Sequence, residues 1–176
     1  MANGDIFVRL ARPDESLSLN AIEAECGAIF RSVAGYEWVD QGVDLSEDIW
    51  GASIKAKMCW VSVEHGVDQP IGFIAAKCFG EDIYIAEVGV VTQFQGRKIG
   101  SLLVAAVEAY ARNVAARAVT LTTFSEIPWN GPYYARLGYT QLAEDQAPAY
   151  LKAIFADEAA RGLMTKPRCA MELTLK

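Results

Sequence analysis

The chain has 176 residues, of which 52% are hydrophobic and 22% are charged, and its formal net charge is −6. This length suits a single domain with a substantial core, and the composition is typical of a soluble globular protein. The negative charge disfavours nucleic acid as the main partner. No apolar run reaches the roughly 18 residues of a membrane span, and the N-terminal residues lack the apolar stretch of a signal peptide.

The N-terminal part of the chain predicts a strand followed by two helices and two further strands. Ile6–Leu10 alternates as a strand, and Pro13-Asp14 opens a helix that ends at Gly35. The apolar stripe of this helix consists of Leu19, Ile22, Cys26, Ile29, Phe30 and Val33. A short helix is predicted over Leu45–Lys55, and strands over Lys57–Glu64 and Ile71–Phe79.

The stretch from Ile83 to Tyr110 joins a strand, a charged loop and an amphipathic helix. Residues 83–91 have the β-branched density of a buried strand, and from Ile99 the apolar residues recur at helical spacing. A loop between strand and helix aims backbone N–H groups at one point, where the helix dipole and two cations add positive charge. This loop is Gln95-Gly96-Arg97-Lys98-Ile99-Gly100, and it predicts a phosphate or pyrophosphate site. A simple β–α turn with surface cations is the alternative.

The C-terminal part continues the alternation of strands and helices. Strands are predicted over Ala118–Phe124, Tyr139–Leu142 and from Cys169 to the end, with a short helix over Pro132–Gly138 and a longer one over Ala147–Arg161. No linker or repeat interrupts the chain. We therefore expect one domain over residues 1–176 with an α/β (α+β) fold, a mixed sheet that carries helices on both faces.

Metal chemistry is not expected. The four cysteines are scattered without a metal-binding spacing, and the single histidine, His65, lies beside Gly66 in an expected turn. Three of the cysteines lie in apolar segments, which predicts buried free thiols in a reducing, cytoplasmic compartment.

Two motifs together resemble the GNAT superfamily of N-acetyltransferases. Motif A of that family reads R/Q-x-x-G-x-G/A, and residues 95–100 match it, except that Lys98 stands where the pattern has glycine. Motif B reads Y-x-x-x-G-F/Y, and Tyr134-Ala-Arg-Leu-Gly-Tyr139 matches it. The resemblance extends over nearly the whole chain. It implies a GNAT-like, mostly antiparallel sheet of about seven strands with helices on both faces.

The resemblance also implies that acetyl-CoA is the co-substrate. In GNAT enzymes the motif A strand separates from the next strand, and the pantetheine arm lies along its backbone, here at Val90 and Val91. Asn130 is a further candidate contact of the cofactor. Gly89 in the middle of the strand predicts a bulge or a close approach. The residues that the resemblance places around the pyrophosphate are Gln95, Gly96, Arg97, Lys98, Ile99, Gly100 and Ser101.

Acetyl transfer to an amine requires a base for the ammonium and an acid for the departing thiolate. Tyr134 matches the tyrosine that protonates sulfur in the family, although packing against Tyr133 also explains it. Glu87, a carboxylate in an apolar strand, is the candidate base, directly or through water, and an outward-facing strand residue is the alternative. The Val90 N–H is the candidate oxyanion donor.

The loop with Tyr36, Glu37, Trp38 and Asp40 forms either an aromatic, acidic mouth for a cationic amine or a solvated connection.

The predicted function is therefore acetyl-CoA-dependent N-acetylation of a primary amine in a small molecule or peptide by direct transfer. The alternative is a non-catalytic acyl-CoA sensor or regulatory module with the same fold. A phosphate-binding α/β protein of another family leaves motif B unexplained. We expect a cytoplasmic enzyme without a metal, nucleic acid or membrane partner, and a homodimer is left open.

Overall fold

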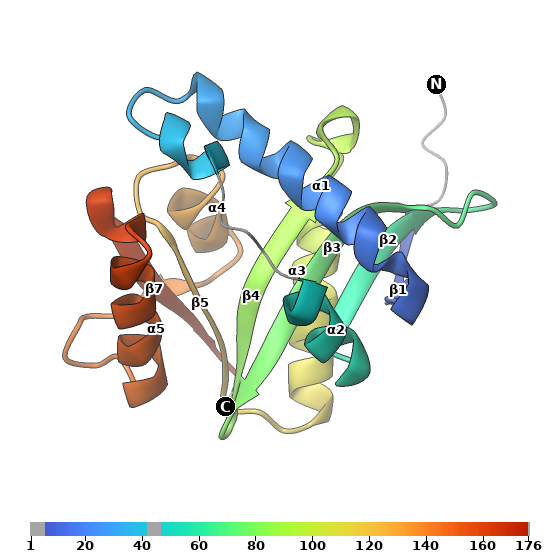
Figure 1. Cartoon of the computed structure of the whole chain (residues 1–176). Helices are drawn as coiled ribbons and strands as arrows, with labels where there is room; N and C mark the ends of the chain where they lie inside the picture. The colour runs from blue at the N-terminus through green and yellow to red at the C-terminus, as the bar shows by residue number, and fades with distance from the viewer. Residues whose placement is uncertain (1–5, 42–46, 176) are drawn as a thin grey trace. The chain divides into compact units, whose positions relative to one another are not determined.

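A computed structural model describes residues 6–41 and 47–175 of the chain (Figure 1). The strands are β1 (Ile6–Leu10), β2 (Cys59–Glu64), β3 (Pro70–Phe79), β4 (Asp82–Val90), β5 (Ala118–Phe124), β6 (Thr140–Gln141) and β7 (Arg168–Thr174). The α-helices are α1 (Ser16–Ala28), α2 (Glu47–Lys55), α3 (Ile99–Asn113), α4 (Gly131–Arg136) and α5 (Ala149–Ala160). Short 3-10 helices include η1 (Pro13–Glu15), η2 (Ile29–Ser32), η3 (Glu37–Gln41) and η4 (Thr92–Phe94).

The seven strands form one sheet in the order β1-β2-β3-β4-β5-β7-β6. β4 and β5 pair in parallel, whereas β1–β2, β2–β3, β5–β7 and β6–β7 are antiparallel. This arrangement confirms the predicted fold class and the predicted order of elements. The helix expected over Leu45–Lys55 begins at Glu47 in the part that the structure describes, and Leu45 lies outside the described residues.

The chain divides into two compact units. The first contains residues 1–77 and 87–109, and the second contains residues 78–86 and 110–176. β4 belongs to both units, because its residues up to Ala86 lie in the second and those from Glu87 lie in the first. The single domain over residues 1–176 stays a prediction.

The core of the first unit lies between α1, α2 and the strands β2 and β3, and Figure 1 shows both helices on the same face of these strands. Trp50 of α2 is fully buried and packs edge-on against Phe73, with ring centroids 4.6 Å apart. Its indole N–H donates a hydrogen bond to the Asn20 side chain of α1. The buried members of this core are Leu19, Ile22, Trp50, Ile54, Cys59, Val61, Val63, Phe73 and Ala75.

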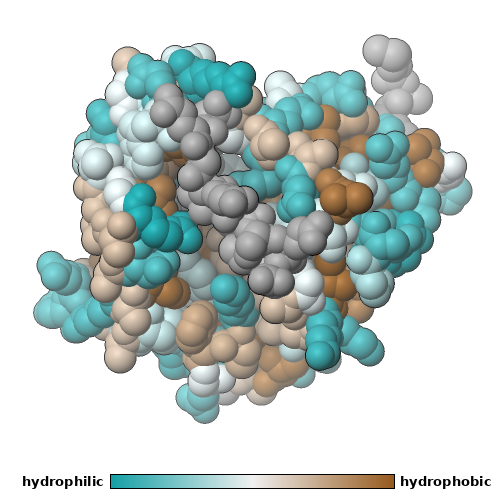
Figure 2. All heavy atoms as spheres, in the orientation of Figure 1, coloured by the Kyte–Doolittle hydropathy of each residue, from teal (hydrophilic) through white to brown (hydrophobic). Residues whose placement is uncertain are grey.

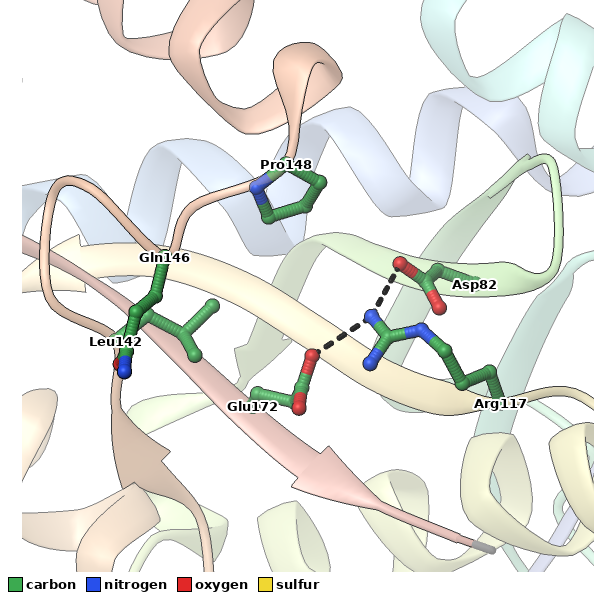
Figure 3. A pocket seen from close by; sticks show the side chains of 6 residues that line it. All are labelled: Asp82, Arg117, Leu142, Gln146, Pro148 and Glu172. Atoms are coloured by element: carbon green, nitrogen blue, oxygen red, sulfur yellow. Dashed lines mark hydrogen bonds and ion pairs between the residues drawn. The ribbon is translucent and has the colours of Figure 1, made fainter.

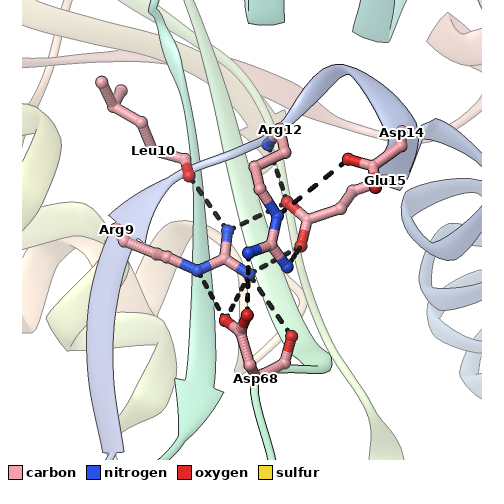
Figure 4. Close-up of polar contacts among 6 residues, drawn as sticks. All are labelled: Arg9, Leu10, Arg12, Asp14, Glu15 and Asp68. Atoms are coloured by element: carbon pink, nitrogen blue, oxygen red, sulfur yellow. Dashed lines mark hydrogen bonds and ion pairs between the residues drawn. The ribbon is translucent and has the colours of Figure 1, made fainter.

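A cluster of charged side chains joins β1, η1 and the β2–β3 turn in the first unit (Figure 4). Arg9 binds Glu15 at 2.6 Å, and both Arg9 and Arg12 bind Asp68. Glu15 also accepts the backbone N–H of Arg12 at 2.7 Å. Burial raises the pKa of Glu15, but the hydrogen bonds from Arg9 and Arg12 outweigh it and lower that pKa below its usual range. The stabilisation from this carboxylate is therefore present at neutral pH and is lost as the pH falls through its folded-state pKa.

The second unit packs α5 against its strands. Leu151 of α5 is fully buried with Tyr84 and Ala170 around it, and Tyr150 stacks on Phe79 at 4.7 Å between ring centroids. Glu158, also on α5, is buried as well.

The face shown in Figure 2 carries apolar residues in separate small groups among hydrophilic ones. In the described part of the chain, no helix combines the length and apolar character needed to cross a bilayer.

Candidate functional site

The motif A loop has a left-handed backbone at two positions. Gly96 has a φ of +77° and Lys98 has a φ of +62°, so Lys98 takes the conformation that explains glycine at this place in the motif. Ile99 is buried at the start of α3, whereas residues 95–98 are exposed. The Gln95 side chain donates to the Val90 carbonyl at 3.1 Å, which attaches the loop to the end of β4.

Replacing Lys98 with glycine is expected to raise the free energy of unfolding by about 0.5–1 kcal/mol. Relief of the left-handed conformation gains about 1–2 kcal/mol, and the added freedom of the unfolded chain removes about 0.4–1 kcal/mol of that gain. Urea unfolding measures the difference. Lys57→Gly is a matched control, because Lys57 has a φ of +55° outside the loop. Both variants should gain stability, and a destabilised Lys98→Gly protein contradicts the strain argument.

Successive backbone N–H groups at the end of β4 point to opposite edges of the strand. The Val91 N–H donates to the Ile71 carbonyl of β3 at 3.0 Å, so it is already engaged. Backbone groups alternate along a strand, and the Val90 N–H therefore points away from β3. The pairs between β4 and β5 run from Asp82 to Ile85, although β4 continues to Val90. Of the two predicted valines, Val90 is thus the better placed donor.

Gly89 is a point of close approach, as predicted. A Cβ at this position would lie 3.0 Å from Cys26 Sγ and 3.0 Å from the Phe73 ring, so a larger residue requires these side chains to move. The Cys26 thiol also donates to the Val90 carbonyl at 3.5 Å. Helix α1 therefore packs directly on the motif A strand.

Two glutamates of the first unit, one on β4 and one on α1, influence each other electrostatically. Glu87 on β4 is half-buried, and Glu23 on α1 has a buried Oε2 atom without a hydrogen-bond partner in the described part of the chain. Burial and the nearby charge of Glu87 raise the pKa of Glu23 to about 9. Sequence reasoning missed Glu23. A signal was present, because Glu23 lies four residues after Leu19 and three before Cys26, on the apolar stripe of the helix.

The predicted residues of motif B lie in the second unit. Tyr134 is 6% exposed, and its ring packs edge-on against Tyr133 at 5.2 Å and Tyr139 at 5.6 Å. The Asn130 side chain donates to Thr123 of β5 at 2.8 Å, so one of its amide protons is used inside the protein. The next residue is Gly131. A Cβ at this position would lie 2.8 Å from the Ser125 carbonyl oxygen, so a larger residue would require the backbone to shift.

The loop that includes Tyr36 and Trp38, a candidate entrance for the acceptor, is less exposed to solvent than the sequence predicts. Tyr36 is only 5% exposed and packs near Phe30, with ring centroids 6.4 Å apart. The Trp38 indole donates to the Gly35 carbonyl at 3.2 Å. Glu37 is exposed, and the Asp40 side chain lies outside the described residues.

A cavity of about 590 Å³ in the second unit involves none of the predicted site residues (Figure 3). Arg117 Nη2 donates to Asp82 at 2.7 Å and to Glu172 at 2.8 Å, which joins the starts of β4 and β5 to β7. In the first unit, a second cavity of about 550 Å³ is lined by Ile22, Val91 and Phe94 among others. The described residues contain no group of three or more His, Cys, Asp or Glu side chains that fits a metal ion.

Comparison with known proteins identifies the family. The sequence model of the acetyltransferase (GNAT) family matches residues 22–139. The PaiA N-acetyltransferase of Thermoplasma acidophilum, solved with coenzyme A, is 13% identical with a TM-score of 0.71, and the match covers 97% of this chain and 99% of that one.

Two further structures share the fold at low sequence identity. A GNAT acetyltransferase of Brucella melitensis, solved with acetyl-CoA, is 18% identical with a TM-score of 0.59, at 99% and 90% coverage. The N-acetylglutamate synthase of Neisseria gonorrhoeae, solved with coenzyme A and N-acetylglutamate, is 17% identical with a TM-score of 0.73. This chain is covered over 99% of its length but spans only 36% of that synthase. From the family match over residues 22–139, which the fold supports, the chain belongs to the acetyltransferase (GNAT) family.

Proposed function

We propose that the protein transfers the acetyl group of acetyl-CoA directly to a primary amine of a small molecule or peptide. The observation that carries this proposal is the left-handed backbone at Lys98. A positive φ also occurs elsewhere in the chain, at Lys57 for example, but at Lys98 it lies in the loop between a strand and a helix N-terminus. Here it precedes α3, which is 15 residues long and presents its positive dipole end to the loop. Backbone N–H groups and the side chains of Arg97 and Lys98 then surround the pyrophosphate of the cofactor.

The reaction moves two protons and one acyl group. The acceptor ammonium loses a proton to Glu87, and the neutral nitrogen attacks the thioester carbon. The Val90 N–H donates to the oxygen that becomes negative. The C–S bond then breaks, and Tyr134 gives its proton to the sulfur so that coenzyme A leaves as a thiol. The free state of the four cysteines supports a reducing, cytoplasmic location for this enzyme.

Thermal unfolding with two ligands tests the cofactor assignment. Coenzyme A at about 100 times its dissociation constant is expected to stabilise the protein by about 2.7 kcal/mol. Pantetheine, which lacks the phosphates, is expected to stabilise it much less. Equal stabilisation by both ligands contradicts a role of the loop in phosphate binding.

Gly100→Val provides the second arm of this experiment. A valine at the start of α3 crowds a pyrophosphate bound there, so the folded variant should lose most of the stabilisation by coenzyme A while its response to pantetheine is unchanged. Unchanged affinity for coenzyme A in this variant means that the loop is only a connector.

A further inference from the structure

The cavity of about 590 Å³ in the second unit combines charged and apolar lining. Figure 3 shows Asp82, Arg117 and Glu172 directed toward one another. Leu142 and Pro148 supply apolar surface around the same space. The residues that surround this space are Asp82, Arg117, Leu142, Gln146, Pro148 and Glu172. None of the residues proposed for acetyl transfer is among them, so acetyl transfer does not explain this cavity.

Two buried carboxylates in this lining share a single cation. The Asp82 and Glu172 side chains are only 6% and 12% exposed. Both accept a hydrogen bond from the same nitrogen of Arg117, Nη2, at 2.7 Å and 2.8 Å. Because one guanidinium carries one positive charge, the three ionised side chains together have one negative charge in excess. A buried charge is costly without a partner of opposite sign, so this arrangement favours a second cation.

The excess charge falls mainly on Asp82. Its Oδ2 atom accepts from Arg117 and from the Tyr150 hydroxyl at 2.9 Å, whereas its buried Oδ1 atom has no hydrogen-bond partner in the described part of the chain. Glu172 has more donors, because its Oε2 atom accepts from Arg117 and its Oε1 atom accepts from the Thr174 hydroxyl at 3.0 Å. Asp82 is thus the lining carboxylate whose charge is less compensated.

The charges beside the cavity leave this balance negative. Helix α5 begins directly after Pro148, and a helix N-terminus adds about half a positive charge. Glu144 and Asp145 outweigh it, because they are exposed in the segment that joins Leu142 to Gln146 and carry two negative charges. A concave surface with an excess of one charge attracts small ions of the opposite sign.

We propose that the cavity binds a small alkylammonium cation, with its charged nitrogen at Asp82 and its alkyl chain against Leu142 and Pro148. This binding site goes beyond the proposed acetyl transfer. An ammonium group has N–H donors and no acceptor, so it complements carboxylate oxygens and brings no acceptor that must be satisfied in turn. Its charge supplies the second cation of the lining, and the two apolar residues shield its methylene groups from water.

Titration of the ligand-free protein with n-butylammonium chloride, followed by NMR, tests this proposal without turnover. Saturable shifts are expected for the Leu142 methyl groups, the Gln146 side-chain amide and the Arg117 Nε–H group. Butanol and butyrate match this probe in length, but they are neutral and negatively charged, so neither should shift these signals to a comparable degree. An increase in sodium chloride of about tenfold should weaken the binding of butylammonium, because salt screens the attraction.

Two substitutions of glutamine by lysine locate the binding site. Gln146→Lys brings a cation to an exposed position of the lining, and it should weaken butylammonium binding about fivefold or more. Gln141→Lys adds the same charge at an exposed residue of β6 outside the lining, and it should change the affinity about twofold at most. Asp82→Asn keeps the shape of the side chain and removes the excess charge, so the folded variant should lose the binding.

The outcomes of these titrations are decisive in both directions. Butanol binding with an affinity equal to that of butylammonium overturns a cation site, because shape alone then explains the binding. Equal affinity in the wild type and Gln146→Lys, or shifts confined to residues outside the lining, overturns this location. The absence of any saturable shift in the wild type overturns the proposal outright. If Asp82→Asn does not fold, the comparison of Gln146→Lys with Gln141→Lys decides. No acetyl transfer is measured, so each of these results leaves the proposed function unaffected.

Discussion

Replacing Tyr134 with phenylalanine is expected to lower kcat by about 10²-fold or more, the lower end of the effect of a general acid. The phenyl ring of phenylalanine keeps the edge-on contacts with Tyr133 and Tyr139, and the substitution removes only the hydroxyl group. The affinity for coenzyme A should change by about 1 kcal/mol at most, the value of one hydrogen bond. Release of the coenzyme A thiol, followed with a panel of amines, measures the rate.

Tyr133→Phe is the matched control, because Tyr133 is its half-buried neighbour on α4 and lies outside motif B. This variant should retain the activity of the wild type. A non-catalytic acyl-CoA sensor would show no turnover in any of these proteins while it still binds coenzyme A. Full turnover by a well-folded Tyr134→Phe protein would remove the general-acid role and leave the family assignment intact.

Replacing Arg168 with methionine is expected to lower the free energy of unfolding by about 3–5 kcal/mol, the effect of breaking a buried ion pair. Arg168 on β7 binds Glu158 on α5 through two hydrogen bonds of 2.7 Å, and the two side chains are 10% and 7% exposed. The Arg168 guanidinium also lies 4.7 Å from the Phe124 ring centroid. Without the cation, Glu158 keeps, within the described part of the chain, only the hydrogen bond from Thr122 at 2.6 Å. Urea unfolding at neutral pH measures the loss.

Arg161→Met provides the comparison at the end of the same helix. Arg161 pairs with Asp157 at 3.7 Å, but the two side chains are 43% and 68% exposed, so this variant should lose less than about 0.5 kcal/mol. A second change, Glu158→Leu in the Arg168→Met background, should recover much of the stability because no unpaired charge remains. If the single variant at Arg168 is no worse than the one at Arg161, burial of this pair does not carry the stability that we assign to it.

The fold could be predicted from the sequence because the spacing of apolar residues agrees along the chain with the residues that begin and end helices and strands. The alternating residues of β1 and the β-branched run of β5 predict these strands with the bounds that the structure shows. The apolar spacing after Ile99 predicts where α3 begins, and the predicted end of the last helix, Arg161, lies one residue beyond the observed end at Ala160. Strand order depends on contacts that are distant in sequence, so local patterns did not predict it, and only the structure provides it.

The candidate site could be predicted only in part. Motif residues name the loop, but the conformation of Lys98 depends on how β4 and α3 meet, and no local preference of lysine indicates a positive φ. Glu23 was missed for a different reason. A glutamate on an amphipathic helix is ordinarily solvated, and the burial of its Oε2 atom follows from the packing of α1 on Gly89. Tyr36 shows the opposite error, because an aromatic residue placed in a loop proved to be buried.

The positions of the four free cysteines affect how turnover of this protein is observed. Cys59 and Cys169 are buried, and burial raises the pKa of Cys26 to about 12, which keeps its thiol protonated and unreactive. Cys78 is exposed, so its sulfur is open to reagents in the solvent. A disulfide reagent that traps the coenzyme A thiol therefore also consumes one protein thiol per chain, and this signal precedes any enzymatic one. A Cys78→Ser protein lowers that baseline and makes slow transfer to a poor acceptor measurable.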